Sequence, residues 1–238
     1  MTEIRALLFD KDGTLFNFQA TWGAFTSALV LQLALGDTAR ARDLGLVVGF
    51  DTESWQFAAN SPVYAATNAE IAGVLLPHLP ELSLAGLIAR MNELGAVTPQ
   101  AEAVPLLPLL AELRSRGLQL GLATNDGEAP ARANLASAGV LEHFEFVAGY
   151  DSGHGGKPAP GMLLAFAAAL SLDPAEVAMV GDSRHDMIAG RAAGMQTVAV
   201  LTGLAGVDDL APIATVVLPD IGHLPAWLDA RKLAVAGS

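Results

Sequence analysis

Two carboxylates, Asp10 and Asp12, stand two positions apart near the start of the chain, and Gly13 and Thr14 follow them. Strand alternation breaks down in such a loop, so both side chains can lean toward one point. One carboxylate could then attack as a nucleophile while the other carries a proton. The pair would also attract a hard divalent cation through its oxygen atoms. An ordinary turn is the alternative, because Asp and Gly are common turn formers.

Thr124 and Asn125 stand where an apolar segment ends and a helical pattern is about to begin. A hydroxyl group and backbone N–H groups at the start of a helix suit a phosphate oxygen. Taken alone, the pattern is explained more simply by residue 124, 125 or 126 capping the next helix.

Lys157 lies in a glycine-rich loop and precedes a proline, an arrangement that can place an ammonium against a phosphate or a carboxylate. A solvated surface lysine is the simpler alternative. Asp182 and Asp186 stand four residues apart and face one side where a loop enters a helix. Such a pair suits Mg²⁺, which takes one or two carboxylates and keeps several waters. Helix capping and a favourable dipole contact are the alternative there.

Together these positions supply an oxygen nucleophile, a second acid, a hydroxyl, a cation and a pair of metal ligands. Phosphoryl transfer needs those parts for in-line attack, charge neutralisation and proton transfer. Each cluster has a simple structural alternative, but coincidence across all four is a poor explanation.

The elements around these residues predict how they meet. An apolar run from Ala6 to Phe9 precedes the first pair, as a buried parallel strand would. From Pro105 onward, strand and helix patterns alternate, which predicts a parallel sheet with helices on both faces. Ligand sites of such sheets lie beyond the carboxyl ends of the strands. Further strands are expected at residues 118–123, 144–148, 177–180, 197–201 and 215–218.

Residues 16–98 lack strand alternation and carry helical patterns instead. Apolar residues recur at three- and four-residue spacing over residues 18–33, behind Asn17 as a candidate cap. The sequence Thr67-Asn-Ala-Glu70 is a capping box that predicts a helix over residues 68–78. We therefore expect a doubly wound α/β core of residues 1–15 and 99–238, with residues 16–98 inserted as an all-helical cap domain.

The order of these motifs resembles the haloacid dehalogenase superfamily. It is most similar to the phosphoglycolate phosphatase-like branch, in which a helical cap follows the first motif. The resemblance spans nearly the whole chain, and it is the combination of motifs that is specific. It implies a doubly wound sheet with a mobile lid. The motifs are Asp10-x-Asp12-Gly-Thr-Leu, Thr124-Asn125, Lys157-Pro and Gly181-Asp182-Ser-x-x-Asp186.

The resemblance also implies a role for each motif residue. Asp10 would form an aspartyl-phosphate, and Asp12 would protonate the leaving oxygen and then activate water. Thr124 and Asn125 would bind the phosphoryl group, and Lys157 would bridge that group and Asp10. The cofactor would be Mg²⁺, bound by Asp10, by the backbone carbonyl of Asp12, by Asp182, and by Asp186 either directly or through water.

The leading hypothesis is a Mg²⁺-dependent phosphatase for a small phosphorylated metabolite, such as 2-phosphoglycolate or a sugar phosphate. A phosphosugar mutase of the same family is one alternative, and a non-catalytic binding or regulatory protein is another. Asp12 disfavours a dehalogenase, because a halide leaving group needs no acid. Residues 16–98 contain no lysine, which disfavours a phosphonate hydrolase that uses a cap lysine. Asn17 stands where many close relatives have an acidic residue, so the subfamily stays open.

Composition narrows the partners. The net charge of −12 argues against a nucleic-acid or anionic-membrane partner. The absence of cysteine excludes disulfides, zinc–thiolate sites and thiol nucleophiles. The longest apolar run is too short to span a bilayer. We expect a cytoplasmic monomer or homodimer whose partner is a small-molecule phosphate ester.

Specificity is expected to come from the cap domain. If the leaving group carries a carboxylate, Arg40 and Arg42 are the first candidates to bind it, although a solvated helix face explains them more simply. Lys11 and Arg184 lie within the motifs and could contact the substrate from the core side. Trp22 could line the cleft between the two domains, although its spacing also suits plain packing.

Overall fold

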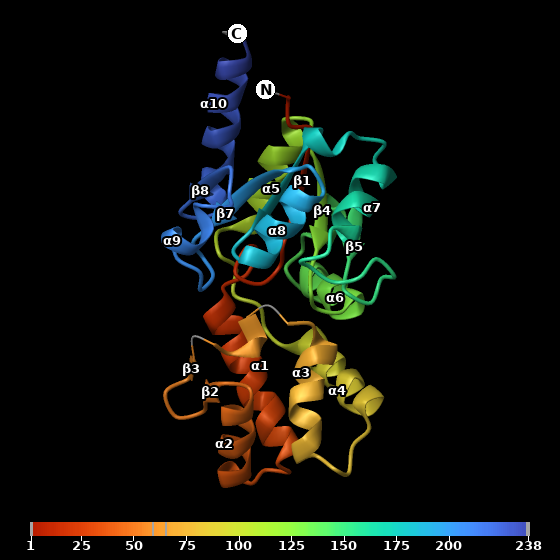
Figure 1. Ribbon diagram of the computed structural model, residues 1–238, viewed down its shortest axis with the longest axis vertical. Coiled ribbons are helices and arrows are strands. Elements are labelled where there is room, and N and C mark those ends of the chain that lie inside the picture. The colour runs from red at the N-terminus through yellow and green to blue at the C-terminus, as the bar shows by residue number, and fades with distance from the viewer. Residues whose placement is uncertain (1, 59, 65, 237–238) are drawn as a thin grey trace.

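The computed structural model describes residues 2–58, 60–64 and 66–236. Figure 1 shows an α/β part built around one sheet and a mostly helical part below it. The six strands of the sheet have the order β5-β4-β1-β6-β7-β8, and all neighbours are parallel. The strands are β1 (Ala6–Phe9), β4 (Gln119–Ala123), β5 (Phe146–Ala148), β6 (Val177–Gly181), β7 (Gln196–Val200) and β8 (Val216–Leu218). The parallel sheet expected from the sequence is thereby confirmed.

Strand β1 lies inside the sheet, and all four of its residues are fully buried. Its last residue, Phe9, pairs with Leu122 of β4 on one side and with Val180 of β6 on the other. The three strands run in the same direction, so the loops that follow them meet at one edge of the sheet. This register brings the loops after Phe9, Ala123 and Gly181 together.

Helices cover both faces of the sheet. On one face, α5 (Leu106–Ser115), α6 (Glu128–Ser137) and α10 (Leu224–Ala236) pack in the same hydrophobic cluster as Leu7 and Phe9. On the other face, α7 (Gly161–Ala169) and α8 (Arg184–Ala192) pack with Ala6 and Leu8. Alternate residues of β1 thus serve opposite faces, as strand geometry requires. A short α9 (Val207–Leu210) follows β7, and neither α9 nor α10 was predicted from the sequence.

The helical part has its own hydrophobic cluster, whose buried members all lie between Phe18 and Met91. Asn17 caps the first helix, and the Thr67–Glu70 capping box begins the third, as predicted. The predicted helix over residues 68–78 is an α-helix to Leu75 and a 3₁₀ turn beyond it. Its helices are α1 (Phe18–Leu33), α2 (Thr38–Val47), α3 (Asn68–Leu75) and α4 (Leu84–Val97).

The helical part is not entirely helical. It contains a small antiparallel ladder between β2 (Phe50–Asp51) and β3 (Gln56–Phe57), in which Phe50 pairs with Phe57. Two-residue strands are too short to show alternation of polar and apolar residues, so the sequence did not predict them. The rings of Phe50 and Phe57 are in contact, with centroids 4.7 Å apart. The domain boundaries at residues 16 and 98 stay a prediction.

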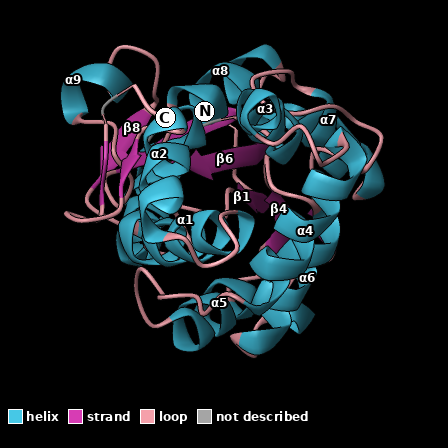
Figure 2. Cartoon of the chain, turned by 90° about the horizontal axis from the view of Figure 1, so that it is seen from below, coloured by secondary structure: helices cyan, strands magenta, loops and turns pink. Residues whose placement is uncertain are grey.

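The two parts meet along α4 and α6, which pack against each other beside the carboxyl edge of the sheet. Figure 2 looks at the molecule from the side of the helical part and shows these two helices together. In the described part of the chain, no helix combines the length and the apolar character needed to cross a bilayer.

Candidate active site

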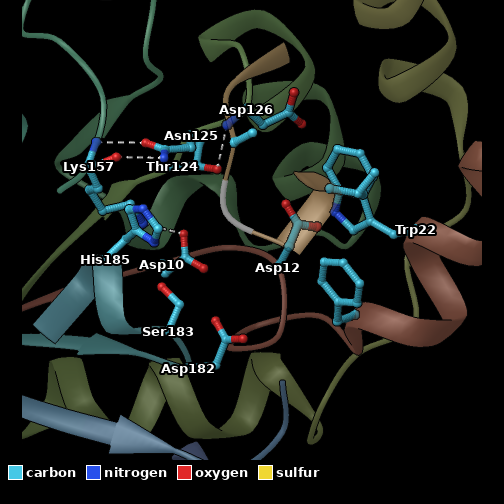
Figure 3. A pocket seen from close by; sticks show the side chains of 13 residues that line it. Asp10, Asp12, Trp22, Thr124, Asn125, Asp126, Lys157, Asp182, Ser183 and His185 are labelled. Atoms are coloured by element: carbon cyan, nitrogen blue, oxygen red, sulfur yellow. Dashed lines mark hydrogen bonds and ion pairs between the residues drawn. The ribbon is translucent and has the colours of Figure 1, made fainter. Parts of the chain in front are cut away.

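A pocket lies between the carboxyl edge of the sheet and the helical part, and it encloses about 400 Å³, open solvent at its mouth included. Figure 3 shows its side chains. The residues from the sheet side are Asp10, Asp12, Thr124, Asn125, Asp126, Lys157, Asp182, Ser183 and His185. Every predicted site residue except Asp186 therefore lines one pocket.

Lys157 is buried and uses all three donors of its ammonium. It donates to Asp10 Oδ1 (2.6 Å), to Asp186 Oδ1 (2.6 Å) and to the backbone carbonyl of Ala123 (2.8 Å). Burial by itself lowers the pKa of Lys157, but Asp10 and Asp186 outweigh it, so the pKa is raised. Lys157 is therefore a fixed positive charge beside Asp10.

Asp10, Asp182 and Asp186 form a cluster whose carboxylate oxygens lie within 4.8 Å of one another. Asp186 also accepts hydrogen bonds from the backbone N–H and hydroxyl of Ser183, at 3.0 and 2.6 Å. Within the described residues, no side chain donates a hydrogen bond to the buried Asp182 carboxylate. Three buried carboxylates with one ammonium leave an excess of negative charge, and hard oxygen donors fit Mg²⁺. The residues present therefore fit the ion.

Two glycines press on the Asp182 side chain. A Cβ on Gly13, which has φ of +81°, would lie 2.4 Å from Asp182 Oδ2, and one on Gly203 would lie 1.7 Å from it. Any larger residue at either position would displace the carboxylate. Gly13 therefore leaves room for the Asp182 side chain, in addition to adopting a positive φ.

Burial raises the pKa of Asp10 to about 7, and Asp186 and Asp12 add to the effect while Lys157 opposes it. Burial likewise raises the pKa of Asp182 well above its ordinary value, with Asp10 and Asp186 as further causes. A cation beside these carboxylates would reverse both shifts, because it favours their ionised forms.

Thr124 and Asn125 hold the neighbouring loops in place. The Thr124 hydroxyl accepts a hydrogen bond from the backbone N–H of Asp126 at 3.0 Å. The Asn125 side chain makes two hydrogen bonds with the backbone of Lys157: its Nδ2 donates to the carbonyl (2.9 Å), and its Oδ1 accepts from the N–H (2.8 Å). Asn125 thus fixes the loop that carries Lys157. Simple capping does not explain the motif, because Gly127 is the N-cap of α6.

Asp12 is paired with Lys11, a different lysine from the one that contacts Asp10. Lys11 Nζ lies 3.2 Å from Asp12 Oδ2 and 3.0 Å from Asp126 Oδ2. The other oxygen of Asp12, Oδ1, is buried and receives no hydrogen bond of good geometry in the described structure, although the Trp22 side chain also acts as a donor toward the Asp12 carboxylate. Burial raises the pKa of Asp12, with Asp126 adding to the effect and Lys11 opposing it. A raised pKa suits a group that must carry a proton.

Residues 4–194 match the haloacid dehalogenase-like hydrolase family. The chain belongs to this family. A phosphoglycolate phosphatase from Rhodospirillum rubrum is 31% identical over 235 residues, which are 94% of this chain and 90% of the relative. The hydrolase class expected from the motifs is confirmed, and the likeness supports the phosphoglycolate phosphatase-like branch.

Solved structures agree on the fold of this hydrolase. A predicted phosphoglycolate phosphatase from Haemophilus somnus superposes with a TM-score of 0.72 at 18% identity, over 95% of this chain and 98% of the other. CbbY from Rhodobacter sphaeroides, in complex with phosphate, superposes with a TM-score of 0.68 at 21% identity, over 93% of this chain and 96% of the other. At such identities the likeness shows the fold alone.

The helical wall of the hydrolase's pocket is apolar. It consists of Phe18, Trp22, Val63 and Ala66, so Trp22 lines the cleft and also packs in the helical cluster. Arg40 and Arg42, the conditional candidates for binding a carboxylate on the leaving group, do not line this pocket. They form exposed pairs with Glu81 and Glu53, so the simpler explanation of a solvated helix face fits them better. Their helix, α2, packs on α1 at a distance from the sheet edge.

Two core residues also differ from expectation. Lys11 lies behind Asp12 and does not line the main pocket, and Arg184 is exposed and donates to the carbonyl of Asp209. Asp126 was not predicted from the sequence as a partner of Lys11. Its position two residues after Thr124 was visible, but the loop that approaches it from the first motif was not.

Proposed function

We propose that this hydrolase is a Mg²⁺-dependent phosphatase that cleaves a small phosphate monoester through an aspartyl-phosphate on Asp10. The observation that carries the proposal is the placement of two aspartates, Asp10 and Asp12, in one pocket, each paired with a different lysine. A nucleophile and an acid–base group are thereby held side by side, with environments that differ.

In the first step, an Asp10 carboxylate oxygen attacks phosphorus, and the bond from phosphorus to the ester oxygen breaks. Asp12 gives its proton to that oxygen as it leaves. Lys157 is bonded to Asp10 Oδ1, so it orients the nucleophile. The hydroxyl hydrogen of Thr124 is the donor proposed for a phosphoryl oxygen, because its oxygen already accepts from Asp126.

In the second step, a water molecule attacks the phosphorus of the aspartyl-phosphate. Asp12, now ionised, takes a proton from that water, and the bond between phosphorus and Asp10 breaks. Phosphate leaves, and both aspartates return to their starting states. Mg²⁺ would be held by Asp10, Asp182 and the Asp12 carbonyl, with Asp186 direct or through water, and when bound it neutralises the charge of the phosphoryl oxygens.

Two substrate classes compete. 2-Phosphoglycolate is supported by the names of the relatives. An ester of an uncharged alcohol, such as a sugar phosphate, is favoured by the pocket lining. All 13 lysines and arginines of the chain lie within described residues, and Lys157 alone among them lines the pocket. Because Lys157 is already paired with Asp10 and Asp186, a carboxylate on the leaving group would find no cation there.

The test is phosphate release by the purified protein from a panel that includes 2-phosphoglycolate and several sugar phosphates. It is run with Mg²⁺ and with chelator, and Asp10→Asn is the control. We expect chelator-sensitive release that vanishes in Asp10→Asn. Folded protein that releases phosphate from no compound with Mg²⁺ present would contradict the proposal. Transfer of phosphate between positions of one sugar would indicate the mutase.

We also propose a small-molecule partner with no nucleic acid or membrane, a cytoplasmic location, and a monomer or homodimer. The apolar helical wall and the net charge of −12 support the first of them.

A further inference from the structure

Lys11 occupies the position between the two motif aspartates, where the proposed chemistry requires no particular residue. Its side chain is nonetheless only 3% exposed. Burying an ammonium is costly unless each of its donors is satisfied. Lys11 Nζ meets this demand with Asp12 Oδ2 (3.2 Å), Asp126 Oδ2 (3.0 Å) and Asn134 Oδ1 (3.0 Å). Lys11 therefore contacts Asp12 with one of its donors, and Asp126 and Asn134 with the other two.

Both other partners of Lys11 are also bonded to the helical part. Asp126 Oδ1 accepts a hydrogen bond from Asn68 Nδ2, at the first turn of α3, at 2.6 Å. Asn134 Nδ2, on α6, donates to the backbone carbonyl of Gly95, in α4, at 3.0 Å. Two helices of the helical part thus reach Asp12 through Lys11, by separate routes.

Apolar packing does not fix Lys11 on all sides. A second cavity of about 270 Å³, open solvent included, borders Lys11 and Asp12 and is closed on its far side by Met91 and other residues of the helical part. The position of the Lys11 ammonium therefore depends on its polar partners. If the helical part moved away, Asp126 and Asn134 would each lose a partner that orients them.

We propose that Lys11 is a positioning residue that couples docking of the helical part to the orientation of Asp12. Lys11 holds Asp12 Oδ2, which leaves Oδ1 as the oxygen that carries the transferred proton. The coupling runs from Asn68 through Asp126, and from Gly95 through Asn134. This inference rests on the proposed phosphatase function, because it assigns Asp12 the proton transfer.

The alternative is that Lys11 merely balances buried charge. The two ideas differ in how activity depends on the leaving group. A p-nitrophenolate leaves without a proton at neutral pH, whereas an alkoxide must be protonated as it departs. Loss of positioned proton transfer should therefore affect alkyl esters selectively, while general damage to the pocket should affect both kinds of ester.

The experiment compares p-nitrophenyl phosphate with benzyl phosphate, an alkyl ester with a ring of similar size, at saturating Mg²⁺. For Lys11→Met we expect kcat/KM to fall on the order of 100-fold for benzyl phosphate, the scale of general acid catalysis. For p-nitrophenyl phosphate it should fall only several-fold. Asn68→Leu should show the same selectivity to a smaller degree, since the Asn134 route remains.

The matched control is Asn92→Leu. Asn92 Oδ1 accepts from the same Asn68 amide at 3.0 Å, but it lies outside both routes to Lys11. The ratio of the two kcat/KM values should not change in this variant. If Lys11→Met does not fold, Lys11→Met with Asp126→Asn removes both charges and keeps the same expectation.

Equal losses on both esters in Lys11→Met or in the double variant, with the wild type active, would overturn the coupling and leave the phosphatase proposal intact. Wild-type protein that releases phosphate from neither ester nor any panel compound would overturn both. Hydrogen exchange gives an independent readout: Lys11→Met should speed exchange in the first turn of α3 and leave β6 unchanged. Unchanged exchange in α3 would contradict the coupling whatever the activity.

Discussion

Two buried lysines each contact one aspartate of the first motif, and they differ in their other hydrogen-bond partners. Lys157 is bonded to Asp10, Asp186 and the Ala123 carbonyl, all within the sheet domain. The partners of Lys11 lead instead to α3 and α4 of the helical part. The proposed nucleophile is therefore held by residues of the α/β part, whereas the proposed proton carrier is connected to the helical part through Lys11.

The two clusters also differ in charge. Lys157 faces three carboxylates, Asp10, Asp182 and Asp186, so that cluster has a formal charge of −2. Lys11 faces two carboxylates and a neutral amide, which leaves −1. We therefore expect the divalent cation at the Lys157 cluster.

The largest expected effect is the loss of phosphate release when Lys157 is replaced. Lys157→Met should lower phosphate release from p-nitrophenyl and benzyl phosphate alike, by about 100- to 1,000-fold. The reason is that the charge beside Asp10 assists the attack on phosphorus, which is the same for both esters. Steady-state kinetics with both esters, after circular dichroism has verified folding, measures this. A loss confined to benzyl phosphate would erase the distinction between the two lysines.

The free energy of unfolding should show how much the ion pair between Lys11 and Asp126 contributes. Lys11→Met leaves the buried Asp126 and the partly buried Asp12 without their ammonium and should cost about 3–5 kcal/mol in the free energy of unfolding. Adding Asp126→Asn should recover part of that loss, since one unpaired charge disappears. Urea unfolding of both variants and of Asp126→Asn completes the cycle. Strictly additive losses would mean that the ion pair contributes nothing as a pair.

The Lys157 cluster should also make the metal-free protein sensitive to pH. Burial raises the pKa of Asp10 from 3.8 to about 7, so its contribution to stability is full below pH about 4 and is lost as pH rises through about 7. Thermal melts in chelator should therefore show stability falling across this window. Asp10→Asn should fall less, and saturating Mg²⁺ should flatten the profile. An identical fall in Asp10→Asn would assign it to other groups.

The smallest effects are expected at the arginines of the helical part. Arg40 and Arg42 form exposed pairs with Glu81 and Glu53, and pairs of this kind contribute less than about 1 kcal/mol. Arg40→Ala and Arg42→Ala should leave kcat/KM for the best panel substrate unchanged. A selective loss with 2-phosphoglycolate would instead show that α2 reaches the leaving group.

The sequence alone determined much of the α/β part. Buried parallel strands are continuous apolar runs, so Ala6–Phe9 and the run at Val177 could be recognised locally, and the motif residues follow their ends. Caps are equally local, which is why Asn17 and the Thr67–Glu70 box were predicted correctly. The strand order and shared direction then bring Asp10, Thr124 and Asp182 to one pocket.

Only the tertiary structure decided the environment of Lys11. Its partner Asn134 lies 123 positions away, and Asn68 lies 58 positions from Asp126. Periodicity records which face of an element is buried, but it carries no information about which polar groups on two packed faces will meet. That depends on how α4 packs against α6 and on where the first loop turns. The same reason placed Arg40 and Arg42 outside the pocket, and it underlies the proposed dependence of Asp12 on the helical part.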